Sequence, residues 1–342
     1  MRRRNIFVRN SGVVLSLAVL GVTFSVMASA ASTPAPAGKM VDLGGHRLHV
    51  NCSGKGTPTV VVENGLGDFS FDWVLVQAKV EKFARICTYD RAGYAWSDPG
   101  PKPRTFAQIN LELHDALAKL GERGPFVLVG HSYGGPVIRN FALMYPHDVA
   151  GMVQVDAAFE GMRVGIGGGK TIRLGEDAKG RSILEPREEM KDSDKPSLPA
   201  DMAIPPELQQ LDPTYKVLPE ADQKLQLWAQ KLLDMQNAEA SQTDWSGEYF
   251  AKWLKASQTG SLGTLPLIVL TRAEGGYGND QDVSGAQMEK ERKEGQAMLV
   301  KLSTNSKQIL VKSGHNMELE APDEVIAAIQ TVVEAARAHK KL

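Results

Sequence analysis

The chain has 342 residues, of which 42% are hydrophobic and 23% are charged, and its formal net charge is -1. This composition provides enough apolar side chains for a sizeable core and excludes a disordered chain. The balanced charge creates no overall field that would attract nucleic acid or an anionic membrane, so we expect neither as a partner through charge.

The first 30 residues have the three parts of a secretory signal. Four arginines lie among the first nine residues, an uncharged and mostly apolar run covers residues 11–28, and small residues at 28–30 suit a signal peptidase. An uncleaved membrane anchor is the alternative, because the run approaches the ~18 residues of a spanning helix. We therefore expect an exported protein, periplasmic or secreted, that is membrane-anchored only if this segment is retained. Residues 31–38 are typical of a short linker.

Residues 39–158 alternate between short apolar runs and amphipathic segments, which is typical of strands separated by helices. Such alternation favours an α/β fold with a mostly parallel sheet covered on both faces. We predict strands at 40–43, 47–52, 59–63, 85–89, 126–129 and 149–155, and helices at 73–82, 105–120 and 134–145.

The alternation stops in residues 159–262, which are rich in Gly, Lys, Pro and Asp and contain no convincing strand. Amphipathic patterns at 221–237 and 249–257 indicate helices, so we predict a helical cap inserted into the core. The core pattern resumes over 263–342. Here we predict strands at 266–271 and 307–311 and helices at 287–303 and 322–339.

The motif Gly130-His131-Ser132-Tyr133-Gly134 lies between a predicted strand and a predicted helix. By itself Gly-x-Ser-x-Gly is a weak signal. Its setting is what a nucleophile elbow requires, because the glycines on either side leave space for a strained turn. We therefore predict that Ser132 is a nucleophile, and that the N-terminus of the following helix favours negative charge beside it.

A serine hydroxyl needs a base to become a good nucleophile, and His315 is the best-placed histidine. It follows the predicted strand 307–311, at the carboxyl end where parallel sheets place active groups. The other six histidines, His131 among them, lie in or beside predicted elements, where structural or solvent-exposed roles are expected.

A carboxylate should orient the imidazole, and the sequence offers several. Asp156 directly follows the strand 149–155, so its position is well fixed. Glu274, Asp280 and Asp282 follow a later strand, in a glycine-rich loop that need not be rigid. Preorganisation favours Asp156, with Glu274 as the next choice and Asp280 or Asp282 after it.

Acyl transfer also needs donors for the oxyanion. We predict the backbone N–H of Tyr133, directly after the nucleophile, and that of Leu66, where Gly65 and Gly67 let the main chain come close. No Cys/His cluster has the spacing of metal ligands, and this chemistry requires no cofactor.

Six segments of the sequence form a recognisable pattern: Glu63-Asn64-Gly65-Leu66-Gly67, Asp72-Trp73, Tyr89-Asp90-Arg91-Ala92-Gly93-Tyr94, Gly130-His131-Ser132-Tyr133-Gly134-Gly135, Val155-Asp156-Ala157 and Ser313-Gly314-His315-Asn316. Together they resemble the α/β-hydrolase fold family, in its esterase/lipase-like group. The resemblance covers about residues 39–158 and 263–340 and implies an eight-stranded sheet, a Ser–His–acid triad and hydrolysis of esters or related acyl compounds. In this family the acid more commonly follows the later strand.

Two details refine the resemblance. The spacing of Asp156 is similar to that of some haloalkane dehalogenases, but those enzymes and epoxide hydrolases use an Asp nucleophile where this chain has Ser132. The resemblance therefore disfavours opening of carbon–halogen bonds and epoxides. Asn64 stands where many members carry His before the oxyanion glycine, which affects the side chain of that loop and not its N–H groups.

The family's strand order also implies that Cys52 and Cys87 lie on neighbouring antiparallel strands. Either a disulfide or two buried thiols fits this placement, and the distance between the two residues decides.

These observations predict an exported serine hydrolase that cleaves esters of a small-molecule acyl substrate. An amidase, lactonase or peptidase would use the same triad. A non-catalytic binding module on this fold is the alternative from another class, and it would be expected to have lost Ser132 or His315.

Overall fold

The structure is a computed structural model that describes residues 33–102, 104–167, 170–173, 204–242, 258–273 and 280–342. The chain divides into two compact units, Met1–Ala35 and Pro36–Leu342. Only residues 33–35 of the first unit are described, and they form no regular secondary structure. The predicted signal segment therefore lies outside the described residues.

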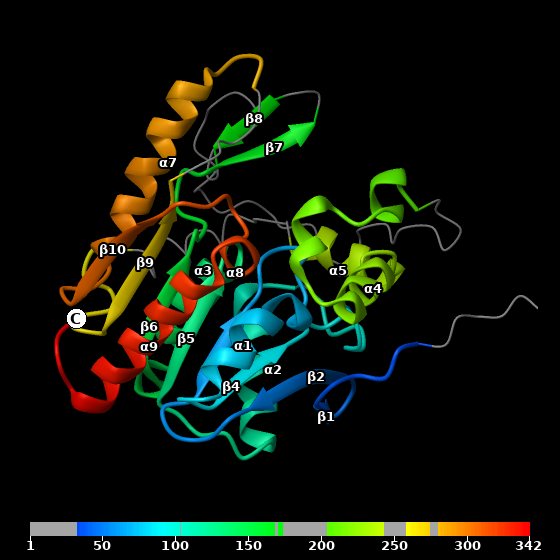
Figure 1. Ribbon diagram of the computed structural model, residues 1–342, viewed down its shortest axis with the longest axis horizontal. Coiled ribbons are helices and arrows are strands. Elements are labelled where there is room, and N and C mark those ends of the chain that lie inside the picture. Colours follow the sequence, from blue (N-terminus) through cyan, green and yellow to red (C-terminus); the bar gives the residue numbers. More distant parts are fainter. Residues whose placement is uncertain (1–32, 103, 168–169, 174–203, 243–257, 274–279) are drawn as a thin grey trace, which may run out of the picture. The chain divides into compact units, whose positions relative to one another are not determined.

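The second unit is built on an eight-stranded sheet with the strand order β1-β2-β4-β3-β5-β6-β9-β10 (Figure 1). β2 runs antiparallel to both β1 and β4, and the remaining neighbours are parallel, which confirms the mostly parallel eight-stranded sheet. The strands are β1 (Lys39–Asp42), β2 (Arg47–Ser53), β3 (Val60–Glu63), β4 (Ile86–Tyr89), β5 (Phe126–His131), β6 (Val149–Val155), β9 (Leu267–Arg272) and β10 (Ser306–Val311).

Helices cover both faces of this sheet, which explains why its central strands are continuous apolar runs. In β3, Val60 and Val62 pack against α1 and α9 on one face, while Val61 packs in the core formed with α2, α3 and α7 on the other. All three valines are buried. The helices are α1 (Val74–Val80), α2 (Phe106–Lys119), α3 (Gly134–Met144), α7 (Gly285–Val300), α8 (Met317–Glu320) and α9 (Pro322–Ala338).

The segment between β6 and β9 contains a hairpin as well as helices, so the expectation that it holds no strand was wrong. It begins with an antiparallel hairpin of β7 (Arg163–Gly167) and β8 (Lys170–Arg173). The hairpin is tied to α7, because Arg163 and Arg173 both form ion pairs with Glu291. The glycines of this stretch break the strict alternation by which strands are recognised in sequence.

The helical part of the same segment contains α4 (Glu220–Ala229) and α5 (Leu233–Gln242), preceded by short 3-10 turns at Pro206–Gln209 and Pro213–Val217. The single helix predicted over 221–237 is thus interrupted between Ala229 and Leu233. Trp228 packs on Trp96 of the core with ring centroids 5.3 Å apart. The helix predicted at 249–257 lies outside the described residues.

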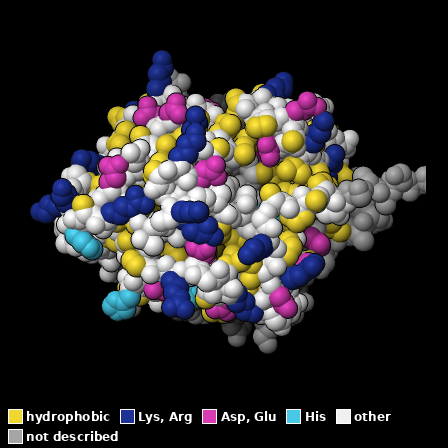
Figure 2. All heavy atoms as spheres, turned by 60° about the horizontal axis from the view of Figure 1, so that its bottom comes forward, with side chains coloured by type: hydrophobic (Ala, Val, Ile, Leu, Met, Phe, Trp, Pro, Cys, Tyr) yellow, Lys and Arg dark blue, Asp and Glu magenta, His cyan; other side chains and the backbone are white. Residues whose placement is uncertain are grey.

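The surface carries mixed charge. On the face drawn in Figure 2, Lys and Arg side chains alternate with Asp and Glu side chains, and apolar side chains lie between them. Charges of both signs are therefore interspersed over this face. In the described part of the chain, no helix has both the length and the apolar character to cross a bilayer.

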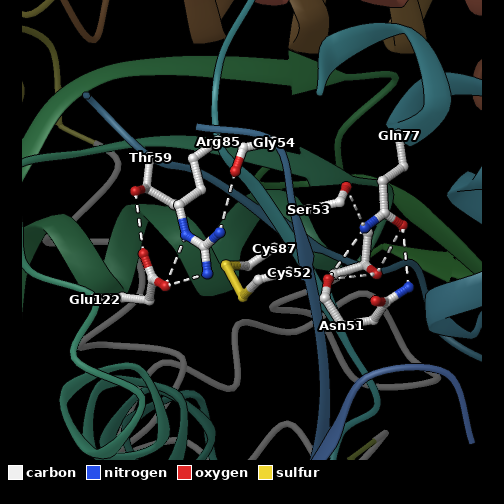
Figure 3. The surroundings of a disulfide bond; sticks show 10 residues. Asn51, Cys52, Ser53, Gly54, Thr59, Gln77, Arg85, Cys87 and Glu122 are labelled. Carbon is white, nitrogen blue, oxygen red and sulfur yellow. Dashed lines mark hydrogen bonds and ion pairs between the residues drawn. A yellow bond between two sulfur atoms is a disulfide. The ribbon is translucent and has the colours of Figure 1, made fainter. Parts of the chain in front are cut away.

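Cys52 and Cys87 form a disulfide between β2 and β4 (Figure 3). The two residues are directly paired in the antiparallel ladder, and their Cα atoms lie 4.0 Å apart. Beside the bond, Arg85 binds Glu122 and the carbonyl of Gly54, as Figure 3 shows. The bond therefore joins the two strands through which the antiparallel part of the sheet meets its parallel part.

Candidate active site

Ser132 stands on the sharp turn between β5 and α3. Its φ of 47° lies in the left-handed region, which a residue other than glycine adopts only where the surroundings enforce it. Its N–H donates to the carbonyl of Val155, and its carbonyl accepts from Ala158 N–H. The serine is therefore held in a strained conformation by the end of the neighbouring strand β6, as a nucleophile elbow requires.

The glycines around Ser132 are needed for space. A Cβ on Gly134 would lie 2.3 Å from the carbonyl oxygen of Glu63, and one on Gly130 would lie 2.7 Å from the carbonyl oxygen of Gly134. Both distances are well inside van der Waals contact with backbone atoms that cannot move freely. The spatial reason for the glycines of the motif is thus as the sequence predicts.

His315 and Asp156 meet beside this elbow. Nδ1 of His315 lies 2.6 Å from Oδ2 of Asp156, and the Asp156 side chain is 3% exposed while that of His315 is 39% exposed. Asp156 itself follows β6 with a φ of 36°, and its N–H donates to Leu270 of β9. The carboxylate is therefore rigidly placed, and the imidazole keeps an accessible edge.

Two of the other predicted acids, Asp280 and Asp282, have partners elsewhere in the structure. Asp280 accepts hydrogen bonds from the backbone N–H of Thr171, Asp282 and Val283, and so belongs to the hairpin and the loop before α7. Asp282 pairs with Lys170. Glu274 lies outside the described residues.

Two arginines surround Asp156, and the sequence did not point to either. Nη1 of Arg272, the last residue of β9, lies 2.7 Å from Oδ2 of Asp156 and 3.1 Å from Nδ1 of His315. Nη1 of Arg292, on α7, lies 3.9 Å from Oδ1 of Asp156. Their positive charge offsets the carboxylate, so Asp156 stabilises a charged imidazole less than an isolated carboxylate would.

These charges set the protonation of the pair. Burial alone would raise the pKa of Asp156, but the hydrogen bond from His315 and the charges of His315 and Arg272 lower it overall. The pKa of His315 is lowered from its ordinary 6.5 by partial desolvation, and His131 and Arg272 add to this while Asp156 opposes it. At neutral pH the site therefore holds a carboxylate and a neutral imidazole, the form that accepts a proton.

Ser132 lies between a residue that contacts His315 and the end of the strand that carries Asp156. Its predecessor His131 packs against the His315 ring with centroids 4.7 Å apart, and its partner Val155 precedes Asp156. Ser132 and His315 are both described, and no hydrogen bond joins the Ser132 hydroxyl to the His315 imidazole. Such contacts are often long in free enzymes and tighten when substrate binds.

The loop after β3 lies against the start of α3. The Leu66 side chain packs in one apolar cluster with Tyr133, and Gly67 has a φ of 82°. The Asn64 side chain, at the position where many members of the resembled family carry His, donates to the carbonyl of Tyr89 and so ties β3 to β4. The two residues predicted as N–H donors to the oxyanion, Leu66 and Tyr133, thus have their side chains in the same apolar cluster.

Arg91 holds the loop after β3 through hydrogen bonds, and the sequence did not single it out for this role. Its buried guanidinium donates to the carbonyls of Asn64 and Gly65 at 2.8 and 2.6 Å, and its Nε donates to Gln242 at the end of α5. One side chain therefore links the loop that carries Leu66 to the inserted segment.

Two groups of side chains in the described residues have ligand atoms within 4.8 Å of one another, as a metal site would need. In the first, Cys52 and Cys87 are joined as a disulfide. In the second, which combines Asp68, His131 and Glu318, both ring nitrogens of the histidine already face hydrogen-bond acceptors. We assign a metal to neither group.

The chain belongs to the alpha/beta hydrolase family, whose model matches residues 60–328. Solved structures share its fold. The epoxide hydrolase CorEH superposes with a TM-score of 0.55 at 15% identity, covering 86% of this chain and 96% of that one. The thioesterase domain from the curacin biosynthetic pathway gives a TM-score of 0.58 at 14% identity, covering 87% and 100%. At these identities the likeness concerns the fold alone.

Curated relatives match over shorter stretches. The protein YqjL of Bacillus subtilis (strain 168) is 36% identical over 100 residues, 29% of this chain and 40% of that protein. A protein of Hormonema carpetanum named as a probable transporter, efuK, is 37% identical over 131 residues, 35% of this chain and 18% of that protein. This chain therefore matches less than half the length of either relative.

Proposed function

We propose that the protein is an exported serine hydrolase that cleaves carboxylic esters through an acyl-enzyme on Ser132. The observation that carries the proposal is the contact of 2.6 Å between Asp156 and His315 beside a strained serine turn. Membership of a hydrolase family supports the general reaction, and this geometry supports its assignment to a serine nucleophile.

In the proposed reaction, the Ser132 hydroxyl attacks the acyl carbonyl while His315 takes its proton. Asp156 accepts a hydrogen bond from the Nδ1–H of His315 and so fixes the tautomer in which Nε2 accepts the proton. The N–H groups of Leu66 and Tyr133 hold the oxyanion. His315 then protonates the leaving alcohol, and a water molecule activated by His315 releases the acid and restores the serine. No cofactor takes part.

Esters are favoured over amides because an alkoxide leaves a tetrahedral intermediate more readily than an amide anion does. An amidase, a lactonase or a peptidase remains the second candidate, since each would use the same groups. Epoxide hydrolysis through an alkyl-enzyme requires a carboxylate at position 132, where this chain has serine. A binding module is disfavoured because the serine, the histidine and the acid are all present.

Export belongs to the proposal as well. It is supported by the signal-like pattern of the first 30 residues and by the disulfide, because disulfides persist in oxidising compartments such as the periplasm. Mass spectrometry of the mature protein tests this part: a chain beginning close to residue 31 supports export with cleavage, and an intact N-terminus contradicts cleavage.

The reaction is tested with a fluorophosphonate probe and a substrate panel. We expect the probe to label the wild type and not Ser132→Ala, and p-nitrophenyl esters to turn over faster than matched anilides and lactones. Labelling with a preference for anilides would replace the esterase with an amidase. An unlabelled wild type would contradict the serine mechanism and favour a binding module.

A further inference from the structure

A second buried His–acid pair lies next to the proposed site. Nδ1 of His131 is 2.8 Å from Oδ2 of Asp68, and Nε2 is 3.0 Å from the backbone carbonyl of His315. The His131 side chain is 1% exposed. The histidine that precedes the serine is therefore bonded to the loop after β3 on one side and to the loop that carries His315 on the other.

Both neighbours of the ring are acceptors, and this fixes its charge. A carbonyl oxygen has no proton to give, and the pKa of Asp68 is lowered against the effect of burial by its bond to His131 and by the charges of His131, His315 and Arg91, which favours the carboxylate form. Each ring nitrogen must then carry a proton. We infer that His131 is held as an imidazolium and acts as a positioning residue that joins the nucleophile, oxyanion and base loops; this deepens the proposed function and depends on it.

The surrounding charges agree with this assignment. Burial disfavours the imidazolium, but Glu318 of α8, Asp68 and Asp156 outweigh it and raise the pKa of His131 to about 10. Oε2 of Glu318 lies 3.9 Å from Nε2 of His131, and burial raises the pKa of Glu318 to about 7. Asp72 and Tyr215 also face this group of acids, and burial and the neighbouring carboxylates raise the pKa of both.

The pair also lies against the loop that carries Leu66. A Cβ on Gly65 would be 2.2 Å from Oδ2 of Asp68 and 2.8 Å from Nδ1 of His131, so the main chain of this loop packs directly on the pair. One charged ring thus holds three loops that come from different parts of the chain. Its charge also opposes a second positive charge on His315 and so favours the neutral base.

Nitrogen NMR of the histidine side chains in the wild type tests the charge directly. At pH 8 we expect both ring nitrogens of His131 to be protonated while His315 carries one proton. In Asp68→Asn, the His131 ring should lose its second proton at lower pH than in the wild type. A neutral His131 ring in the wild type at pH 8 would overturn the inference. This readout needs no substrate, so it is independent of the proposed reaction.

The positioning role is tested by pH profiles of kcat/KM for His131→Gln. We expect kcat/KM to fall by about 10- to 100-fold, as for displaced catalytic groups. We also expect the acid limb of the profile, the loss of kcat/KM at low pH, to move to higher pH, because a positive charge beside His315 is removed. His49 provides the matched control. It is also 1% exposed, its Nδ1 lies 2.7 Å from Oδ2 of Asp90, and its Nε2 faces the carbonyl of Ala37, yet none of these groups contacts His315.

We expect His49→Gln to lower stability without moving the acid limb. A His131→Gln variant that keeps the acid limb of the wild type would show a merely structural histidine and overturn the inference. Ser132→Ala separates the two proposals. If it retains ester hydrolysis, the proposed function has failed; if it is inactive while His131→Gln shows no shift, only the inference about His131 has failed.

Discussion

Asp156 and His315 are 159 positions apart in the chain, and Oδ2 of Asp156 lies 2.6 Å from Nδ1 of His315. The sheet produces this contact, because β6 and β10 flank β9 and end at the same edge. Asp156 follows the first of these strands directly, and His315 follows the last after a short loop. The carboxyl ends of parallel strands thus assemble the pair.

Removal of the acid should weaken the base without unfolding the protein. For Asp156→Asn we expect kcat/KM to fall by about 10³–10⁴-fold, because the amide no longer selects the tautomer or stabilises the charged imidazole. The measurement is ester hydrolysis at pH 8. Asp280→Asn is the matched control, and its kcat/KM should stay near that of the wild type. A loss in Asp280→Asn with full activity in Asp156→Asn, or a comparable loss in Glu274→Gln alone, would assign the acid to the loop after β9.

The pH dependence of hydrolysis should follow His315. Because its folded pKa lies below the ordinary 6.5, kcat/KM should hold to pH values below 6.5 and be lost as the pH falls through that lowered pKa. Arg272→Met removes a positive charge 3.1 Å from Nδ1, so the acid limb should move to higher pH. Arg163→Met, which removes a guanidinium from the hairpin, should leave the limb in place. A limb that moves down in Arg272→Met would contradict this electrostatic assignment.

The space around the elbow can be tested with two glycines at equivalent helix positions. Gly134 and Gly285 are the first residues of α3 and α7. Gly134→Ala should cost about 1–3 kcal/mol of stability and abolish most activity, because its Cβ would press on Glu63. Gly285→Ala meets nothing within 4 Å and should be neutral or stabilising by up to about 1 kcal/mol. Denaturant titration of both variants checks this.

The disulfide should contribute stability and leave the chemistry unchanged. It closes a loop of 35 residues, for which chain entropy gives about 3–4 kcal/mol. We expect urea denaturation of the Cys52→Ala/Cys87→Ala variant to show a loss of that order, with ester turnover retained at 25 °C. Equal stability of the variant and the wild type would mean that the strand pairing alone holds β2 against β4.

The core of the fold was predictable because its signals are local. Val60, Val61 and Val62 form a continuous apolar run that indicates a strand buried on both faces, and the turn at Ser132 follows from two glycines and the flanking elements. Asp156 could be favoured because it abuts its strand. Each of these inferences needed only a few neighbouring residues.

What the sequence did not yield depends on contacts between distant segments. Arg272 ends an apolar strand, and its position against Asp156 appears only when β6 and β9 pair. The charge of His131 depends on Asp68 and on the His315 carbonyl, which the fold brings to the ring from both sides. The hairpin of β7 and β8 was missed because its glycines hide the alternation, while its attachment to Glu291 is made across the fold.

The most direct test of the account is a single-turnover experiment on Ser132. Mixing the wild type with a p-nitrophenyl ester should release a burst of about one equivalent of p-nitrophenolate per chain if deacylation is slow, and an acid quench should trap an acyl group that peptide mapping assigns to Ser132. Ser132→Ala should show neither. An acyl group on another residue, or an undiminished burst from Ser132→Ala, would contradict the serine mechanism.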